Sequence, residues 1–166
     1  THVRAGYEIQ RGSLILRSGV KESMAIKVSI VEDDDWIREN LATQISRTEG
    51  FVFGCAYRNG EDAVTQIPRE SPDVILMDIN LPKMNGIECV RKIKAVLPGV
   101  QILMLTVYED SEKIFKSLLA GANGYLLKRT PQNEILEAIA EVHRGNSPMS
   151  GHIARKDGKP WAAQFG

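Results

Sequence analysis

At the centre of the chain, residues 73–78 read Asp-Val-Ile-Leu-Met-Asp, and Ile-Asn-Leu-Pro-Lys-Met-Asn-Gly follows up to residue 86. The almost continuous apolar run Asp73–Met77 predicts a short strand that is buried on both faces of a parallel sheet. Asp78 follows this strand directly, and an ionised carboxylate beside so apolar a segment needs a polar or charged partner. The stretch therefore predicts a central strand with a functional carboxylate at its carboxyl end.

Apolar runs alternate with amphipathic stretches on both sides of this strand. The other predicted strands are Lys27–Val31, Phe51–Tyr57, Val100–Leu105 and Tyr125–Leu127, and the predicted helices are 36–47, 61–67, 86–97, 111–122 and 131–143. Pro68 is expected to end the second of these helices. Five strand–helix units in strict alternation predict an α/β fold, a doubly wound sheet of five parallel strands with helices on both faces.

Composition bounds the class of protein. The 166 residues favour one globular domain, and 43% hydrophobic with 25% charged residues argue against disorder, a collagen-like chain or a coiled coil. We find neither an apolar run of about 18 residues nor a signal peptide, so we expect a cytoplasmic protein without membrane association. Cys55 and Cys89 suit neither a disulfide framework nor a zinc site, and we expect both to be reduced, buried and structural.

The net charge of zero conceals an uneven distribution. Residues 26–150 carry 14 basic and 18 acidic side chains, whereas residues 1–25 and 151–166 each have an excess of two basic side chains. An acidic middle argues against direct binding of the nucleic-acid backbone. We interpret both ends as linker or expression-derived sequence, with a possible hairpin of Tyr7–Gln10 and Leu14–Leu16; the alternative is that one end forms a dimer contact.

Charged and hydroxyl side chains follow four of the predicted strands. They are Glu32 to Asp35, Asp78, Thr106 and Lys128. In a doubly wound sheet these positions meet at one edge, where crowded carboxylates need a cation such as Mg²⁺ and a lysine can contact a phosphate oxygen. Each has a simpler explanation when taken alone, such as Asp35 capping the next helix. Their conjunction favours a site for a divalent ion and a phosphate.

These motifs resemble the receiver domain of a two-component response regulator, over about residues 26–144. The motifs are Val31–Asp34, Asp78 with residues 81–86, Leu105–Thr106 and residues 121–128. Residues 124–128, 138–145 and 147–150 are further similar to the NarL/LuxR type. The resemblance implies a CheY-like, flavodoxin-like (βα)5 fold with strand order 2-1-3-4-5. It also implies an extension over 1–25, a receiver over 26–146 and a linker or tail over 147–166.

The resemblance also implies the roles of the site residues. Asp78 would accept a phosphoryl group from a sensor histidine kinase, and Mg²⁺ (or Mn²⁺) would be bound by Asp33, Asp78, the Asn80 backbone carbonyl and, through water, Glu32. Lys128 would contact the phosphoryl group, Thr106 would reorient toward it, and Tyr125 would be the aromatic switch. Asn80 and Tyr108 would tune dephosphorylation, and Asp34 would lie outside the acidic pair. One departure is Arg129-Thr130, which separates Lys128 from Pro131 where many receivers have the proline directly.

The implied function is a phosphorylation switch rather than a turnover enzyme. NarL/LuxR-type regulators carry a helix-turn-helix domain after the receiver, and 16 residues after Ser150 are too few for one. We therefore expect DNA binding only through an output domain outside this chain, and a phosphorylation-linked homodimer. The alternatives are a stand-alone interaction switch and a haloacid-dehalogenase-like phosphatase, which would need an aspartate where Asn80 stands. An FMN-binding flavodoxin-like protein is disfavoured because the acidic run 32–35 would repel its phosphate.

Overall fold

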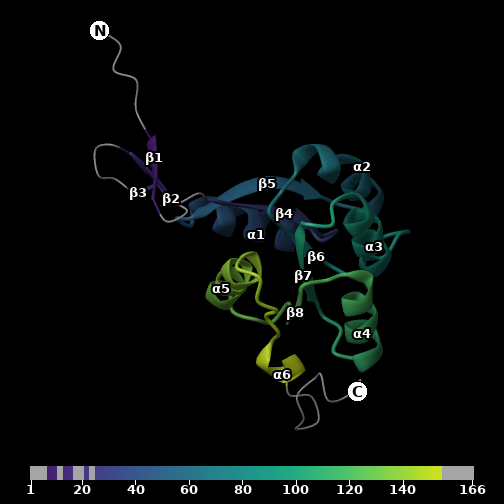
Figure 1. Cartoon of the computed structure of the whole chain (residues 1–166). Helices are drawn as coiled ribbons and strands as arrows, with labels where there is room; N and C mark the ends of the chain where they lie inside the picture. The colour runs from purple at the N-terminus through teal and green to yellow at the C-terminus, as the bar shows by residue number, and fades with distance from the viewer. Residues whose placement is uncertain (1–6, 11–12, 17–20, 23–24, 155–166) are drawn as a thin grey trace.

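The computed structural model of the chain describes residues 7–10, 13–16, 21–22 and 25–154 (Figure 1). Its main sheet has five parallel strands in the order β5-β4-β6-β7-β8. Their bounds are β4 Ile26–Val31, β5 Phe51–Tyr57, β6 Val74–Met77, β7 Gln101–Thr106 and β8 Gly124–Leu127. This is the order 2-1-3-4-5 in the numbering of the five strand–helix units, so the predicted doubly wound sheet is confirmed.

Five helices cover the two faces of this sheet, as Figure 1 shows. Their bounds are α1 Asp35–Arg47, α2 Gly60–Glu70, α3 Gly86–Val96, α4 Ser111–Ala120 and α5 Gln132–His143. The central strand β6 alternates between two cores: Val74 and Leu76 belong to the core beneath α1 and α5, and Ile75 and Met77 to that beneath α2, α3 and α4. Burial on both faces explains why its sequence is a continuous apolar run rather than an alternating one.

Helix α2 is longer than the sequence predicts. Pro68 was expected to end it, but the helix continues to Glu70 with Pro68 inside. The prediction was wrong because Pro68 lies in the last turn, where a missing N–H costs only one intrahelical bond. Ser71 provides the actual end, since it adopts a left-handed conformation with φ of 50° and its N–H bonds the Ile67 carbonyl at 2.8 Å.

The two cysteines differ in burial. Cys89 lies on the buried face of α3, and burial raises the pKa of its thiol to about 12. Cys55 was also expected to be buried, but it is exposed. The reason is topological, because β5 is the edge strand of the main sheet and is covered less completely than the central strands.

A second, smaller sheet lies at the N-terminal end of the chain. Strands β1 Tyr7–Gln10 and β2 Ser13–Leu16 pair antiparallel, as the hairpin prediction had it, and β3 Lys21–Glu22 adds a third strand that was not predicted. At the other end, a four-residue helix α6, Gly151–Ala154, precedes the last twelve residues, which lie outside the described part. None of the helices in the described residues is long and apolar enough to cross a bilayer.

Candidate functional site

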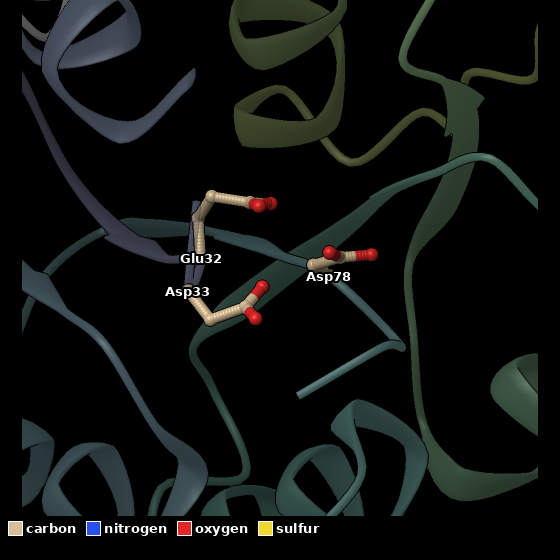
Figure 2. A group of neighbouring side chains, drawn as sticks. All are labelled: Glu32, Asp33 and Asp78. Carbon is tan, nitrogen blue, oxygen red and sulfur yellow. The ribbon is translucent and has the colours of Figure 1, made fainter. Parts of the chain in front are cut away.

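Three carboxylates meet at the carboxyl edge of the sheet. Glu32 and Asp33 follow β4, Asp78 follows β6, and one oxygen from each lies within 4.8 Å of the others. Figure 2 shows the Glu32 and Asp33 carboxylates extending from the end of β4 toward Asp78. Glu32 and Asp78 are buried, whereas Asp33 is exposed. The arrangement follows from topology, because β4 and β6 are adjacent parallel strands and end side by side.

Lys128 supplies the counter-charge from the far side of the site. It follows β8, and its Nζ donates hydrogen bonds to Asp78 Oδ2 at 2.8 Å and to Glu32 Oε1 at 3.0 Å. Burial alone would lower the pKa of this amine, but the two carboxylates that accept its hydrogen bonds raise it above its usual value. The amine is therefore held charged between Asp78 and Glu32.

The positive charge near Glu32 does not compensate for the burial of its carboxylate. Burial raises its pKa to about 7, with Asp78 adding to the effect and Lys128 opposing it. Oxygen ligands at this spacing suit a hard divalent cation, which would restore the charged form. The spacing of the three carboxylates and the uncompensated negative charge of Glu32 both fit a metal ion between Glu32, Asp33 and Asp78.

The loop between β4 and α1 holds the acidic pair in place. Asp34 caps α1, because its side chain accepts a hydrogen bond from the Ile37 N–H at 2.9 Å. Asp35 was expected to supply the cap and a first-turn charge: the cap was wrong, but Asp35 is the acidic residue of the first turn, where it pairs with Arg38. Asp34 donates its N–H to Glu32 Oε1 at 3.2 Å, and its own carboxylate is not part of the three-carboxylate group.

Arg38 is a site-supporting residue that the sequence reasoning missed. It is only 6% exposed, and its Nη1 donates to the carbonyl oxygens of Glu32 at 2.9 Å and Asp33 at 3.3 Å. Its position three residues before the buried Leu41 places it on the buried face of α1. That signal was present in the sequence, since an arginine on an apolar stripe has to find acceptors in the interior.

The loop after Asp78 brings the start of α3 against the strand end. The Asn80 N–H lies 3.4 Å from Asp78 Oδ1, and the Gly86 N–H donates to the Ile79 carbonyl at 2.8 Å. A side-chain carbon at Gly86 would lie 1.8 Å from the Asp78 carbonyl oxygen, so only glycine fits. Asn80, one of the expected site residues, stands two positions after Asp78 and is exposed.

Thr106 is the last residue of β7, and Tyr125 is the second residue of the neighbouring strand β8. Thr106 Oγ1 is buried, and in the described part of the chain it has no hydrogen-bond partner. A buried hydroxyl without a partner is costly, so it suits a position that awaits an acceptor oxygen. Tyr125 is completely buried, and its hydroxyl donates to the Tyr108 carbonyl at 2.8 Å. The resemblance implies that Tyr125 is the aromatic switch, and in this structure its ring lies inside the protein.

Most of the chain matches a known protein family. The model of the response regulator receiver domain matches residues 28–140, which include every one of the expected site residues. The chain belongs to the response regulator receiver domain family. The transcriptional regulatory protein LnrK of Bacillus subtilis is 36% identical over 136 residues, which are 82% of this chain and 62% of LnrK. The response regulator VraR of Staphylococcus epidermidis is 32% identical over 80% of this chain and 64% of VraR.

Solved structures give the same family. A LuxR-family two-component response regulator from Aurantimonas is 28% identical, with a TM-score of 0.77 over 85% of this chain and 98% of that one. A CheY-like receiver from Methanospirillum hungatei is 30% identical, with a TM-score of 0.68 over 73% of this chain and 95% of that one. The chain is thus a receiver domain of a LuxR-type response regulator, a signalling domain rather than a turnover enzyme. It spans 62–64% of the length of the two curated relatives named above.

Proposed function

We propose that Asp78 of this receiver accepts a phosphoryl group from the phosphohistidine of a sensor histidine kinase. The observation that carries the proposal is the contact between Asp78 and Lys128 within a group of three carboxylates, of which Glu32 and Asp78 are buried. A carboxylate oxygen of Asp78 attacks the phosphorus atom. The phosphorus–nitrogen bond of the phosphohistidine breaks, and its electron pair returns to the imidazole of the kinase. The product is an acyl phosphate on Asp78.

The surrounding residues stabilise charge on the transferring group. Lys128 already donates to Asp78, so its ammonium lies where phosphoryl oxygens would arrive. The Thr106 hydroxyl, which has no hydrogen-bond partner among the described residues, would donate a hydrogen bond to an oxygen of the phosphoryl group. Asp33, Asp78, the Asn80 carbonyl and, through water, Glu32 would hold Mg²⁺ (or Mn²⁺). The bound ion would neutralise negative charge on the oxygens of the phosphoryl group.

We further propose that phosphorylation controls a helix-turn-helix output domain encoded beyond this receiver. In this proposal the protein acts in the cytoplasm, and phosphorylation leads to formation of a homodimer. Support comes from the relatives, because LnrK is named a transcriptional regulatory protein and is longer than the part that this chain matches. DNA would then be bound by the output domain alone. A stand-alone interaction switch is the alternative, and gel filtration and DNA binding of the longer gene product, with and without phosphorylation, distinguish the two.

Mass spectrometry tests the phosphoryl acceptor directly. The protein is incubated with Mg²⁺ and acetyl phosphate, and its intact mass is measured. We expect the gain of one phosphoryl group in the wild type and in Asp34→Asn, in which asparagine is an equally good helix cap. Asp78→Asn should gain none. Absence of an adduct on the wild type, or an adduct that persists in Asp78→Asn, would overturn the assignment.

A further inference from the structure

The chain that leaves the receiver returns to the open edge of its sheet. After α5, residues 148–150 run beside β8, with a parallel bridge between Tyr125 and Met149. The Tyr125 N–H donates to the Pro148 carbonyl at 3.0 Å, and the Ser150 N–H donates to the Tyr125 carbonyl at 3.1 Å. Both backbone groups of the expected switch residue are therefore bonded to this segment. We name residues 148–154 the return segment.

Two packing contacts fix the return segment. Ile153 is completely buried in the core that also contains Tyr125 and Leu127. Gly124 permits the close approach of the backbones, because a side-chain carbon there would lie 2.7 Å from the Pro148 carbonyl oxygen. The segment is thus integrated into the sheet rather than lying loosely on its surface.

Ser150 closes the turn that carries Lys128. The turn is formed by a hydrogen bond from the Thr130 N–H to the Leu127 carbonyl at 2.9 Å. From outside, Ser150 Oγ accepts the Leu127 N–H at 2.9 Å and lies 3.1 Å from Thr130 Oγ1. One hydroxyl therefore holds both ends of the turn from which the Lys128 side chain reaches Asp78.

We propose that Ser150 is a positioning residue for phosphoryl transfer, and that the return segment couples phosphorylation of Asp78 to the chain that follows. The proposal rests on the proposed function. In this structure the docked segment coexists with Lys128 on Asp78 and with Tyr125 buried. A phosphoryl group on Asp78 that accepts a hydrogen bond from Lys128 favours the same arrangement. Phosphorylation therefore strengthens the binding of the return segment to the edge of β8. By linkage, docking favours phosphorylation to the same degree.

The first experiment measures the effect of the hydroxyl on the reaction. Ser150→Ala removes one hydrogen bond to a backbone N–H, and we expect phosphorylation by acetyl phosphate to slow by roughly 3- to 10-fold. Ser150→Thr, which keeps the hydroxyl, should restore the rate. Ser147→Ala is the matched control, since Ser147 is an exposed serine of the same connection, and it should react as the wild type does. Equal rates for Ser150→Ala and the wild type would overturn the positioning role.

The second experiment measures the coupling and separates it from a loss of fold. Hydrogen exchange of the Tyr125, Leu127 and Ser150 amides is compared before and after phosphorylation, with the phosphoryl content checked by intact mass. We expect exchange at these amides to slow by fivefold or more upon phosphorylation, with no change in Asp78→Asn. A phosphorylated protein with unchanged or faster exchange overturns the coupling and leaves the proposed function standing. A wild type that gains no phosphoryl group overturns both.

Discussion

Lys128 Nζ lies 2.8 Å from Asp78 Oδ2, although 50 residues separate them in sequence. The two residues follow β8 and β6, which are separated only by β7 in the sheet. Parallel topology places all strand ends at the same edge, and this converts sequence-distant residues into one site. The contact also means that the site contains its own cation before any metal binds.

Replacement of Lys128 by methionine should affect both stability and chemistry. The substitution leaves Glu32 and Asp78 buried without a cation; protonation of Glu32 relieves part of the cost, so we expect a loss of about 2 kcal/mol in the free energy of unfolding. Phosphorylation by acetyl phosphate should slow by at least tenfold, because the donor to the transferring oxygens is gone. Urea denaturation and intact mass measure the two effects.

Lys116→Met is the control for this prediction. Lys116 also forms an ion pair, with Glu112 at 2.6 Å, but both side chains are more than half exposed. An exposed pair contributes at most about 1 kcal/mol. Equal stability of the two variants would contradict the view that Lys128 balances buried charge.

The raised pKa of Glu32 predicts an unusual pH dependence for the metal-free protein. The Glu32 carboxyl has a pKa of about 7 in the folded protein and 4.5 in the unfolded chain, so between these values the folded state binds more protons than the unfolded state. Stability contributed by Glu32 is therefore full below pH 4.5 and is lost as pH rises toward 7, by at most about 3 kcal/mol.

Thermal unfolding in EDTA between pH 5 and 8 measures this effect. We expect Glu32→Gln to flatten the curve, because its amide does not titrate. Millimolar Mg²⁺ should recover stability mainly above pH 7, where Glu32 is ionised. A wild-type curve with the same slope as that of Glu32→Gln would refute the prediction.

Arg38 should determine how well the acidic pair binds a metal. Its guanidinium donates to the carbonyl oxygens of Glu32 and Asp33, and thereby fixes the backbone from which both carboxylates extend. We expect Arg38→Met to weaken Mg²⁺ binding by about tenfold, as loss of a supporting group does at other metal sites. The Mg²⁺ affinity of Arg38→Lys should lie between those of the wild type and Arg38→Met, because an ammonium group keeps the charge but lacks the planar, forked donors of a guanidinium.

Isothermal titration with Mg²⁺ measures this affinity, with Arg58→Met as the control. Arg58 is also an arginine near the loop, but it is 73% exposed and 3.8 Å from Asp35. The control should bind Mg²⁺ as the wild type does. Unchanged affinity in a folded Arg38→Met would show that the loop is held without this arginine.

The sequence predicts the parts of the site that topology determines. Asp78 and Lys128 could be placed together because a five-unit alternation leaves little choice of sheet, and strand ends then share an edge. The burial of Arg38 could be inferred from its place on the apolar stripe of α1, but its role could not, because its partners are backbone carbonyls that no sequence pattern identifies. The side-chain conformation of Tyr125 could not be predicted because packing selects among its rotamers. The pairing of residues 148–150 with β8 could not be predicted because three residues at a sheet edge show no periodicity.

The lifetime of the phosphoryl group should depend on the ring of Tyr108. This residue is half-buried two positions after Thr106, and the Lys113 ammonium lies 4.6 Å from the centre of its ring. Tyr108 and Asn80 line the same cavity beside the site, so we expect the ring to limit the approach of water to Asp78 and Tyr108→Ala to lose phosphate several-fold faster. Loss of the phosphoryl adduct is followed by intact mass after the donor is removed.

Two further variants separate the ring from its surroundings. Tyr108→Phe keeps the ring and should retain the wild-type lifetime, since the hydrogen bond from Tyr125 ends on the backbone carbonyl of residue 108. Lys113→Gln removes the cation from the ring and should shorten the lifetime by less than Tyr108→Ala, because an exposed cation–π contact contributes only about 0.5 to 1 kcal/mol. If Tyr108→Ala retains phosphate as long as the wild type, water reaches Asp78 by another route and the ring is no barrier.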